Sequence, residues 1–255
     1  VSAFLLNRSS DLLVKPWWLL IGAALCSNLF NTVRGATVAY FFLDIIGPDL
    51  KLSFMGIMFL FYSGLFLGIG EVANMAGVAL CVPIANKVGK KNTVMVVNAA
   101  LVVFSILFFF VPCTSSGFWT MLILQIIISI FTGIMSPLVW SMYADVSDYA
   151  ELKFKTASTG LIFSSASMAQ KFGGAIGGAA VLWLLSGFGY VTDADQLAAG
   201  VVQPESALLV LRWLMSFIPA MVAAFAIIVV WFYPLTTKRV QAINEELRAV
   251  RDIED

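Results

Sequence analysis

A lysine lies near the middle of a long apolar stretch of this sequence, which runs from about residue 159 to residue 185. Small and polar residues around it recur at the three- and four-residue spacing that places side chains on one helix face: Ser164, Ser167, Lys171, Gly174 and Gly178. A charged side chain at the centre of a bilayer costs about 2.5–3.5 kcal/mol, so it needs a carboxylate partner or a water-filled cavity. The stripe therefore predicts a site for a polar solute or an ion. The alternatives are glycines that only let helices approach closely and a lysine that only holds helices together.

A second polar stripe lies in the apolar stretch 118–143, and its members again have helical spacing: Gln125, Ser129, Thr132, Ser136 and Tyr143. Pro137 cannot donate to the carbonyl of Gly133, which predicts a kink and an exposed polar backbone group. Amides and hydroxyls along a kinked face suit a sugar, although hydrogen bonding between helices explains them equally well. Trp140 and Trp183 are candidates to stack on a sugar ring, but membrane-interface or packing roles are favoured for both.

The first two apolar stretches also contain charged residues. Ser27, Asn31 and Arg34 lie four and three residues apart in the first stretch, so Asn31 is one turn from Arg34 and a buried role is expected for the arginine. Glu71 is the acid placed at membrane depth in the second. It has three interpretations: a partner for Arg34 or Lys171, a ligand for a coupling cation, or a residue at the membrane interface.

An acidic cluster follows the fourth apolar stretch, and its members are Asp145, Asp148 and Glu151. Basic residues lie in the loop between the second and third stretches: Lys87, Lys90 and Lys91. This juxtaposition predicts a latch of ion pairs at one end of the molecule. Exposed ion pairs contribute only about 0.2–1 kcal/mol each, so the latch would bias conformations rather than hold the fold. The alternative is a solvated acidic turn.

The elements that must position these residues are membrane-spanning helices. The chain has 255 residues, 60% of them hydrophobic and only 12% charged, and its mean hydropathy is +0.94. Apolar runs are long enough to cross a bilayer, which takes about 20 residues. Six spans are predicted, at about 17–43, 60–86, 94–112, 118–143, 159–185 and 207–234. Residues 52–59 are assigned to an outer surface segment, 1–235 to the bundle, and 236–255 to an amphipathic cytoplasmic tail.

The distribution of basic residues predicts the orientation of the bundle. Only Lys51 and Arg212 fall on one side of the six-span arrangement. The other side has Arg8, Lys15, Lys87, Lys90, Lys91, Lys153, Lys155, Lys238, Arg239, Arg248 and Arg251. The second side, with both termini, is therefore expected to be cytoplasmic. A start at Val1 without an initiator methionine suggests that a segment precedes the chain.

Composition argues against several classes of function. The sequence has no histidine, and its three cysteines have no metal-ligand spacing. It has neither an H-E-x-x-H motif nor a nucleophile elbow, so an enzyme is not expected, and no cofactor or metal site is predicted. The net charge is zero, which does not favour nucleic acid as a partner.

The stretch from Trp140 to Gly174 resembles the glycoside–pentoside–hexuronide:cation symporter family, which belongs to the major facilitator superfamily and includes melibiose carriers. The family pattern A-D-x-x-D-Y-x-E, followed in the next helix by K-x-G, is matched by Ala144, Asp145, Asp148, Tyr149, Glu151, Lys171, Phe172 and Gly173. Supporting matches are Arg34 with Tyr40, Phe41, Phe42 and Gly47, and a basic loop with Pro83, Lys87, Gly89, Lys90 and Lys91.

The resemblance implies an all-α membrane protein whose six spans are helices seven to twelve, the C-terminal half of a major facilitator fold. It implies symport of a sugar or glycoside with Na⁺, H⁺ or Li⁺ by alternating access, in a bacterial inner membrane. The residues expected to contact the sugar are Asn31, Arg34, Gln125, Ser136, Trp140, Ser167 and Lys171. Glu71 and Lys171 are expected to couple the cation, and Asp145, Asp148, Tyr149 and Glu151 to form the gate.

The sequence departs from the family pattern at Lys155, Thr156 and Ala157, where a glycine and arginines are common, so the gating contacts of this loop are expected to differ. The N-terminal half and its carboxylates are absent, and half a carrier cannot enclose a site formed between two halves. That half is therefore an expected partner. The competing class is a non-transporting membrane scaffold or receptor, which has no need of a lysine at mid-depth.

Overall fold

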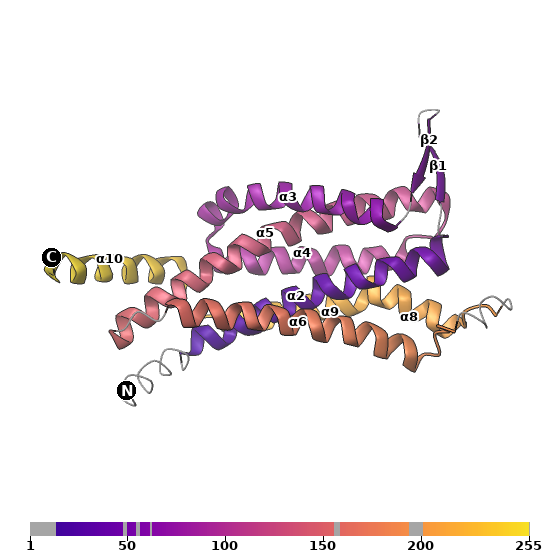
Figure 1. The fold of residues 1–255 in the computed structure, drawn as a ribbon. Helices are drawn as coiled ribbons and strands as arrows, with labels where there is room; N and C mark the ends of the chain where they lie inside the picture. The colour runs from indigo at the N-terminus through magenta and orange to yellow at the C-terminus, as the bar shows by residue number, and fades with distance from the viewer. Residues whose placement is uncertain are drawn as a thin grey trace.

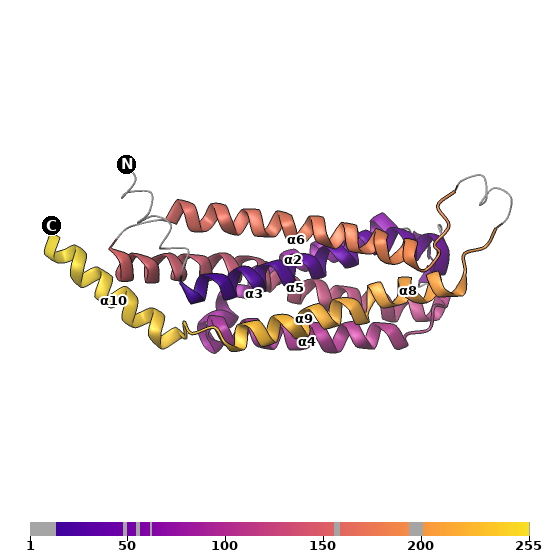
Figure 2. The same ribbon diagram turned by 90° about the horizontal axis from the view of Figure 1, so that it is seen from below.

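Within the part of the chain that the structure describes, six helical segments are long and apolar enough to cross a membrane, which confirms the predicted all-α architecture. The computed structural model describes residues 14–47, 50–54, 57–61, 63–155, 159–193 and 201–254. The spans lie roughly along one direction in an elongated bundle (Figures 1 and 2). The first five are α2 (Lys15–Phe41) with its π-helical end η2 (Phe42–Ile46), α3 (Ser63–Val88), α4 (Lys90–Phe110), α5 (Ser115–Phe154) and α6 (Thr159–Gly187).

The segment before α3 is a hairpin rather than a seventh span. Strands β1 (Leu50–Phe54) and β2 (Ile57–Phe61) pair antiparallel, with Leu52 opposite Phe59. The hairpin projects from one end of the bundle (Figure 1). The second span therefore begins at Ser63, three residues later than predicted, because residues up to Phe61 belong to the hairpin.

Helix α5 is longer than predicted. It has 40 residues and continues to Phe154, well beyond the predicted end of the fourth span at residue 143. Neither proline nor glycine interrupts residues 138–154, and buried Val146 and Ala150 keep this end packed. At about 1.5 Å per residue the helix is about 60 Å long, roughly twice the hydrocarbon thickness of a bilayer.

The sixth span is broken, although the sequence predicted one uninterrupted helix. Its two parts are α8 (Glu205–Met215) and α9 (Phe217–Trp231), and Ser216 between them has φ −132° and ψ −81°. Pro219 lies four residues after Met215 and has no N–H, so it cannot donate the hydrogen bond that would continue the helix through Met215. The carbonyl of Met215 therefore lacks its usual intrahelical donor.

Beyond the spans, α10 (Thr237–Glu254) extends from the same end of the bundle as the end of α5 (Figures 1 and 2). Ile243 and Leu247 of this helix are buried in the apolar cluster that also contains Val146. The segment predicted as an amphipathic tail thus forms a helix with one side packed on the bundle.

Close helix crossings depend on glycines. A Cβ atom on Gly77 of α3 would lie 2.0 Å from the carbonyl oxygen of Ile130, and one on Gly133 of α5 would lie 2.1 Å from that of Asn74. On α6, a Cβ atom on Gly173 would lie 3.0 Å from the carbonyl oxygen of Leu25 of α2. Small residues therefore set the contacts of α3 with α5 and of α2 with α6.

We expect Gly77→Ala to lower the free energy of unfolding by about 1–3 kcal/mol, because the added methyl group forces α3 away from α5. Gly68→Ala on the same helix is the matched control, since nothing lies within 4 Å of its Cβ position. Unfolding midpoints of the purified protein in detergent measure the difference. Equal midpoints for the two variants would contradict the tight crossing.

Candidate functional site

A polar recess lies between α2, α3 and α5 and has a volume of about 310 Å³. Its polar lining comes from all three helices and consists of Asn31, Arg34, Glu71, Asn74, Gln125, Ser129, Thr132 and Ser136. Five residues of the sequence-predicted set thus meet in one place: Asn31, Arg34, Glu71, Gln125 and Ser136. Asn74 was not predicted, although its position one turn after Glu71 was a signal for it.

A smaller recess of about 130 Å³ continues this polar surface between α2, α5 and α6. It shares Asn31, Thr132 and Ser136 with the larger one, and its other polar lining residues are Ser27, Asn28, Trp140 and Gln170. Asn28 and Gln170 were not predicted from the sequence. Both are adjacent in sequence to residues of the predicted stripes. Whether they or their neighbours line a recess depends on how each helix is rotated in the bundle.

Arg34 is held by partners from three other helices. Its Nη2 donates to Oε1 of Gln125 at 2.7 Å, and its Nη1 donates to the carbonyl of Met215. The guanidinium carbon lies 5.1 Å from the ring centroid of Phe108, a cation–π distance. The side chain is only 5% exposed, as predicted for a buried arginine.

Glu71 does not pair with Arg34, which was one interpretation of the sequence. Among the residues that the structure describes, the recorded ion pairs do not include Glu71. Glu71 is exposed on the recess and has Asn74 one turn away. Nδ2 of Asn74 donates to the hydroxyl of Thr132 at 3.2 Å, which leaves its carboxamide oxygen available as an acceptor.

Lys171 and Ser167 lie outside both recesses, which differs from the prediction that they share a site with Gln125. Helix α6 buries Ala169 and Gly173, and Lys171 is two residues from each. Two residues correspond to about 200° around a helix, so the exposed lysine lies on the opposite face. The hydroxyl of Ser167 donates to the carbonyl of Phe163 in its own helix at 3.0 Å.

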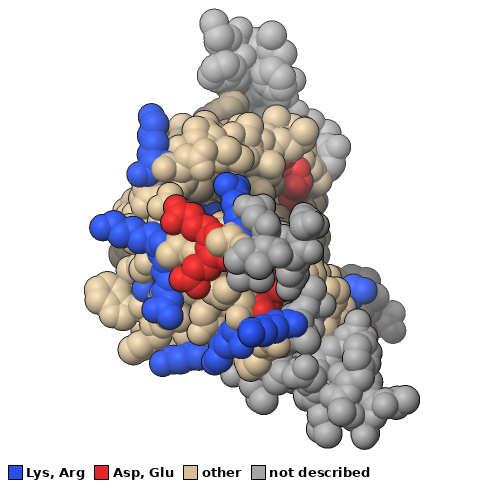
Figure 3. Space-filling view, turned by 90° about the vertical axis from the view of Figure 1, so that its left-hand side faces the viewer, with Lys and Arg blue, Asp and Glu red and all other residues tan. Residues whose placement is uncertain are grey.

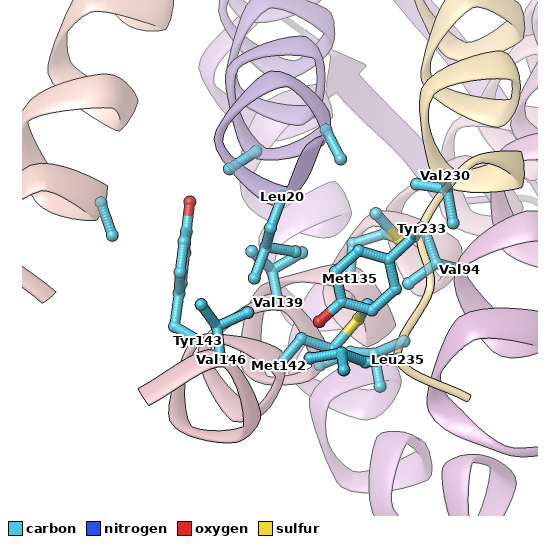
Figure 4. Close-up of a cluster of buried hydrophobic side chains, with 14 of the residues drawn as sticks. Leu20, Val94, Met135, Val139, Met142, Tyr143, Val146, Val230, Tyr233 and Leu235 are labelled. Carbon is cyan, nitrogen blue, oxygen red and sulfur yellow. The ribbon is translucent and has the colours of Figure 1, made fainter. Parts of the chain in front are cut away.

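The aromatic residues mainly serve packing. Trp140 lines the smaller recess, but one ring face stacks on Phe163 at a centroid distance of 5.8 Å. Trp183 is exposed on α6, away from both recesses. Tyr143, the last member of the α5 stripe, is fully buried in the apolar cluster and does not line the recess (Figure 4).

A salt bridge joins α4 to α5 at the end of the bundle that carries α10. Nζ of Lys90 lies 2.7 Å from both carboxylate oxygens of Asp145. Lys and Arg side chains gather at this end of the molecule among acidic side chains (Figure 3). Asp148, Tyr149 and Glu151, the other predicted gating residues, are half-buried on the following turns of α5.

A recess of about 230 Å³ lies beside this salt bridge and reaches α10; its polar lining is Asn86, Lys90, Asp145, Thr237 and Gln241. Tyr233, between α9 and α10, is buried nearby (Figure 4). Burial raises the pKa of its phenol, and the carboxylate of Asp145 raises this pKa further. The phenol therefore stays neutral beside the salt bridge.

Basic side chains also cap helix ends. Nζ of Lys91 donates to the carbonyls of Trp231 and Tyr233, at 2.8 and 2.7 Å, at the end of α9. At the opposite end of the bundle, Nη2 of Arg212 donates to the carbonyl of Phe109 near the end of α4, at 2.7 Å. A lysine of α4 thus caps the end of α9, and an arginine of α8 caps the end of α4.

Comparisons with known proteins agree with the architecture. Residues 12–237 match the family described as MFS/sugar transport protein. The chain is 29% identical over 240 residues to the inner membrane symporter YicJ of Escherichia coli K12, covering 93% of this chain and 48% of the relative. It is 27% identical to the glucuronide carrier protein homolog of the same organism, covering 91% and 47%.

It is also 30% identical over 183 residues to the isoprimeverose transporter of Lactiplantibacillus pentosus, covering 72% of this chain and 36% of that protein. The chain spans about half the length of the first relatives, in agreement with a six-span half of a major facilitator fold. Because the match extends over all six spans, the chain belongs to the MFS/sugar transport protein family.

Proposed function

We propose that this chain forms the C-terminal half of a carrier that moves a sugar or glycoside, together with a monovalent cation, by alternating access. The observation that carries the proposal is the recess between α2, α3 and α5. Its amides and hydroxyls offer both donors and acceptors. A sugar hydroxyl needs both kinds of partner when it leaves water, because an unpaired buried polar group is costly.

The recess is open on the side where a second half would pack. Asn31, Glu71 and Ser136 line it and are exposed in this chain. In transporters built from repeated halves, the substrate site lies near the bilayer midplane at the interface between them. The proposed partner is therefore an N-terminal half that closes the recess and contributes further contacts to the sugar.

Two charged groups support cation coupling. Glu71 contributes a carboxylate to the recess, and the carboxamide oxygen of Asn74 is a second oxygen ligand one turn away. Lys171 lies in the middle of a span, on the face of α6 opposite to its buried residues, where an ammonium group needs a carboxylate partner or water. We assign both residues to coupling with Na⁺, H⁺ or Li⁺, with the acids that pair with Lys171 on the N-terminal half.

The salt bridge of Lys90 with Asp145 supports a gate at the cytoplasmic end. The carboxylate is 9% exposed and the lysine 35%, so the pair is only partly desolvated. Such a pair shifts the balance between conformations by about 1 kcal/mol rather than locking one of them. Asp148, Tyr149 and Glu151 extend the same surface and are assigned to contacts with the N-terminal half.

The setting of the proposed carrier is a bacterial inner membrane with both ends of this chain in the cytoplasm. The competing class, a scaffold or receptor of the same architecture, gains no support from the recess, since it requires neither an open polar cavity nor a lysine in mid-span. Uptake assays separate the two classes.

We expect a cysteine at Asn92 to react with a membrane-impermeant maleimide only from the cytoplasmic side, and a cysteine at Gly187 only from outside. Both positions are exposed at helix ends, and the excess of basic residues places the end with Asn92 in the cytoplasm. Labelling of intact and opened cells measures this. Reaction at Asn92 in intact cells would contradict the orientation.

We expect Asp145→Lys to lower the initial uptake rate of the complete carrier about tenfold, equivalent to about 1.4 kcal/mol, because it places two ammonium groups side by side. The exchange Lys90→Asp with Asp145→Lys rebuilds the pair and should restore most of the rate. Glu205→Lys, at an exposed acid on the other end of the bundle, is the control. An exchanged variant as slow as the single variant would rule out the latch.

The proposed function is tested with the complete carrier in proteoliposomes, by uptake of labelled glycosides under an imposed Na⁺ or H⁺ gradient. We expect Lys171→Met to abolish cation-driven accumulation while the protein still inserts and folds, because the variant keeps the bulk of the side chain and removes its charge. Lys238→Met, in the first turn of α10, is the matched control.

Glu71→Gln should likewise lower accumulation at least tenfold, with Glu205→Gln as its control. The two outcomes that count against the proposal are distinct. Normal accumulation with normal cation dependence in Lys171→Met would remove this lysine from coupling. Absence of gradient-dependent uptake for every glycoside tested in the parent carrier would favour the scaffold or receptor class.

A further inference from the structure

At the break in the sixth span, the carbonyl of Met215 is satisfied by another helix. In an unbroken helix the carbonyl of Met215 would accept from the N–H of residue 219, but that residue is proline. Nη1 of Arg34, on α2, donates to this carbonyl instead. Inside a membrane no bulk water is available to donate to this carbonyl, so breaks of this kind persist only where neighbouring groups of the protein supply the donor.

The same guanidinium also orients a side chain of the recess. Its Nη2 donates to Oε1 of Gln125 at 2.7 Å, which directs Nε2 of the amide towards the hydroxyl of Ser129 at 3.4 Å. Gly70 of α3 provides the space for this arrangement, since a Cβ atom there would lie 3.0 Å from Oγ of Ser129 and 3.1 Å from Nε2 of Gln125. Gln125 therefore presents an N–H donor to the recess.

We propose that Arg34 is a positioning residue that supplies the donor missing at Pro219 and, through the same guanidinium, fixes Gln125 as a hydrogen-bond donor to the substrate. The inference rests on the proposed function of the recess. It differs from direct recognition by Arg34, whose side chain is almost fully buried and whose donors face Met215 and Gln125. One side chain, Arg34, then stabilises the break in the sixth span and also orients the amide of Gln125 in the recess.

A double-variant cycle in the complete purified carrier tests the first half of the inference. Arg34→Met should lower the unfolding midpoint, because it leaves the carbonyl of Met215 unpaired. Pro219→Ala restores a backbone N–H at the position that can pair with this carbonyl, so Arg34→Met should cost much less in that background. Additive effects of the two changes would overturn the proposal.

Arg212→Met is the matched control for this cycle, since Arg212 also donates to a backbone carbonyl, that of Phe109, but lies outside the recess. Its loss should lower the midpoint to the same extent with and without Pro219→Ala. Rescue of both arginine variants by Pro219→Ala would show general stabilisation and would overturn the specific pairing.

The second half is tested by transport kinetics in the Pro219→Ala background, which keeps the arginine variant folded. Arg34→Met and Gln125→Leu should each raise the KM for the sugar about tenfold, and the two together should raise it no more than twofold beyond either one. Arg212→Met should leave KM unchanged. Multiplied effects of Arg34→Met and Gln125→Leu would mean that the two residues act independently, and the positioning role would fail.

The two proposals fail in distinguishable ways. A carrier that moves no sugar would overturn the proposed function, whereas the unfolding cycle would still decide whether Arg34 replaces the donor that Pro219 lacks. A coupled unfolding cycle with an unchanged KM in Arg34→Met would confine Arg34 to the fold and overturn its positioning of Gln125.

Discussion

Within the apolar interior of a bilayer, every backbone carbonyl that leaves the regular helical pattern needs a donor from the protein, and this constraint organises the polar side chains of the bundle. Arg34 donates to the carbonyl of Met215 where the sixth span is broken. Arg212 donates near the end of α4 and Lys91 at the end of α9. Each of these long cationic side chains thus links two helices at a point where a helix ends or breaks. Arg34, which stabilises the break, also contacts Gln125 in the recess.

The recess itself follows from close packing elsewhere. Gly77 and Gly133 bring α3 and α5 together so closely that a methyl group at either position would collide with backbone. Glu71 and Gln125 precede these glycines on the same two helices, and with polar side chains of α2 they line the recess. Residues that pack helices and residues that line the recess therefore alternate along α3 and α5, and a change in either set affects the other.

The two cations in the middle of spans differ in burial, and this difference separates a structural role from a functional one. Arg34 is buried and has partners within the chain, whereas Lys171 is exposed on the face of α6 opposite to its contact with α2. Both lie in the middle of spans. A buried cation with partners maintains geometry, while an exposed one at membrane depth requires a group contributed by another surface. This difference is why Lys171, rather than Arg34, is assigned to coupling.

The sequence by itself determined the six spans, the polar stripes and the position of the acidic cluster, because apolar run length and helical spacing are local properties. It also placed Asn31, Arg34, Gln125 and Ser136 on faces that could meet. Only the tertiary structure decided that Glu71 does not pair with Arg34, that Tyr143 belongs to the core, and that Lys171 is not part of the recess lining. Those outcomes depend on the rotation of each helix against its neighbours and on the break at Ser216. The carbonyl of Met215 and its donor Arg34 are 181 residues apart, so this hydrogen bond exists only after the helices have packed.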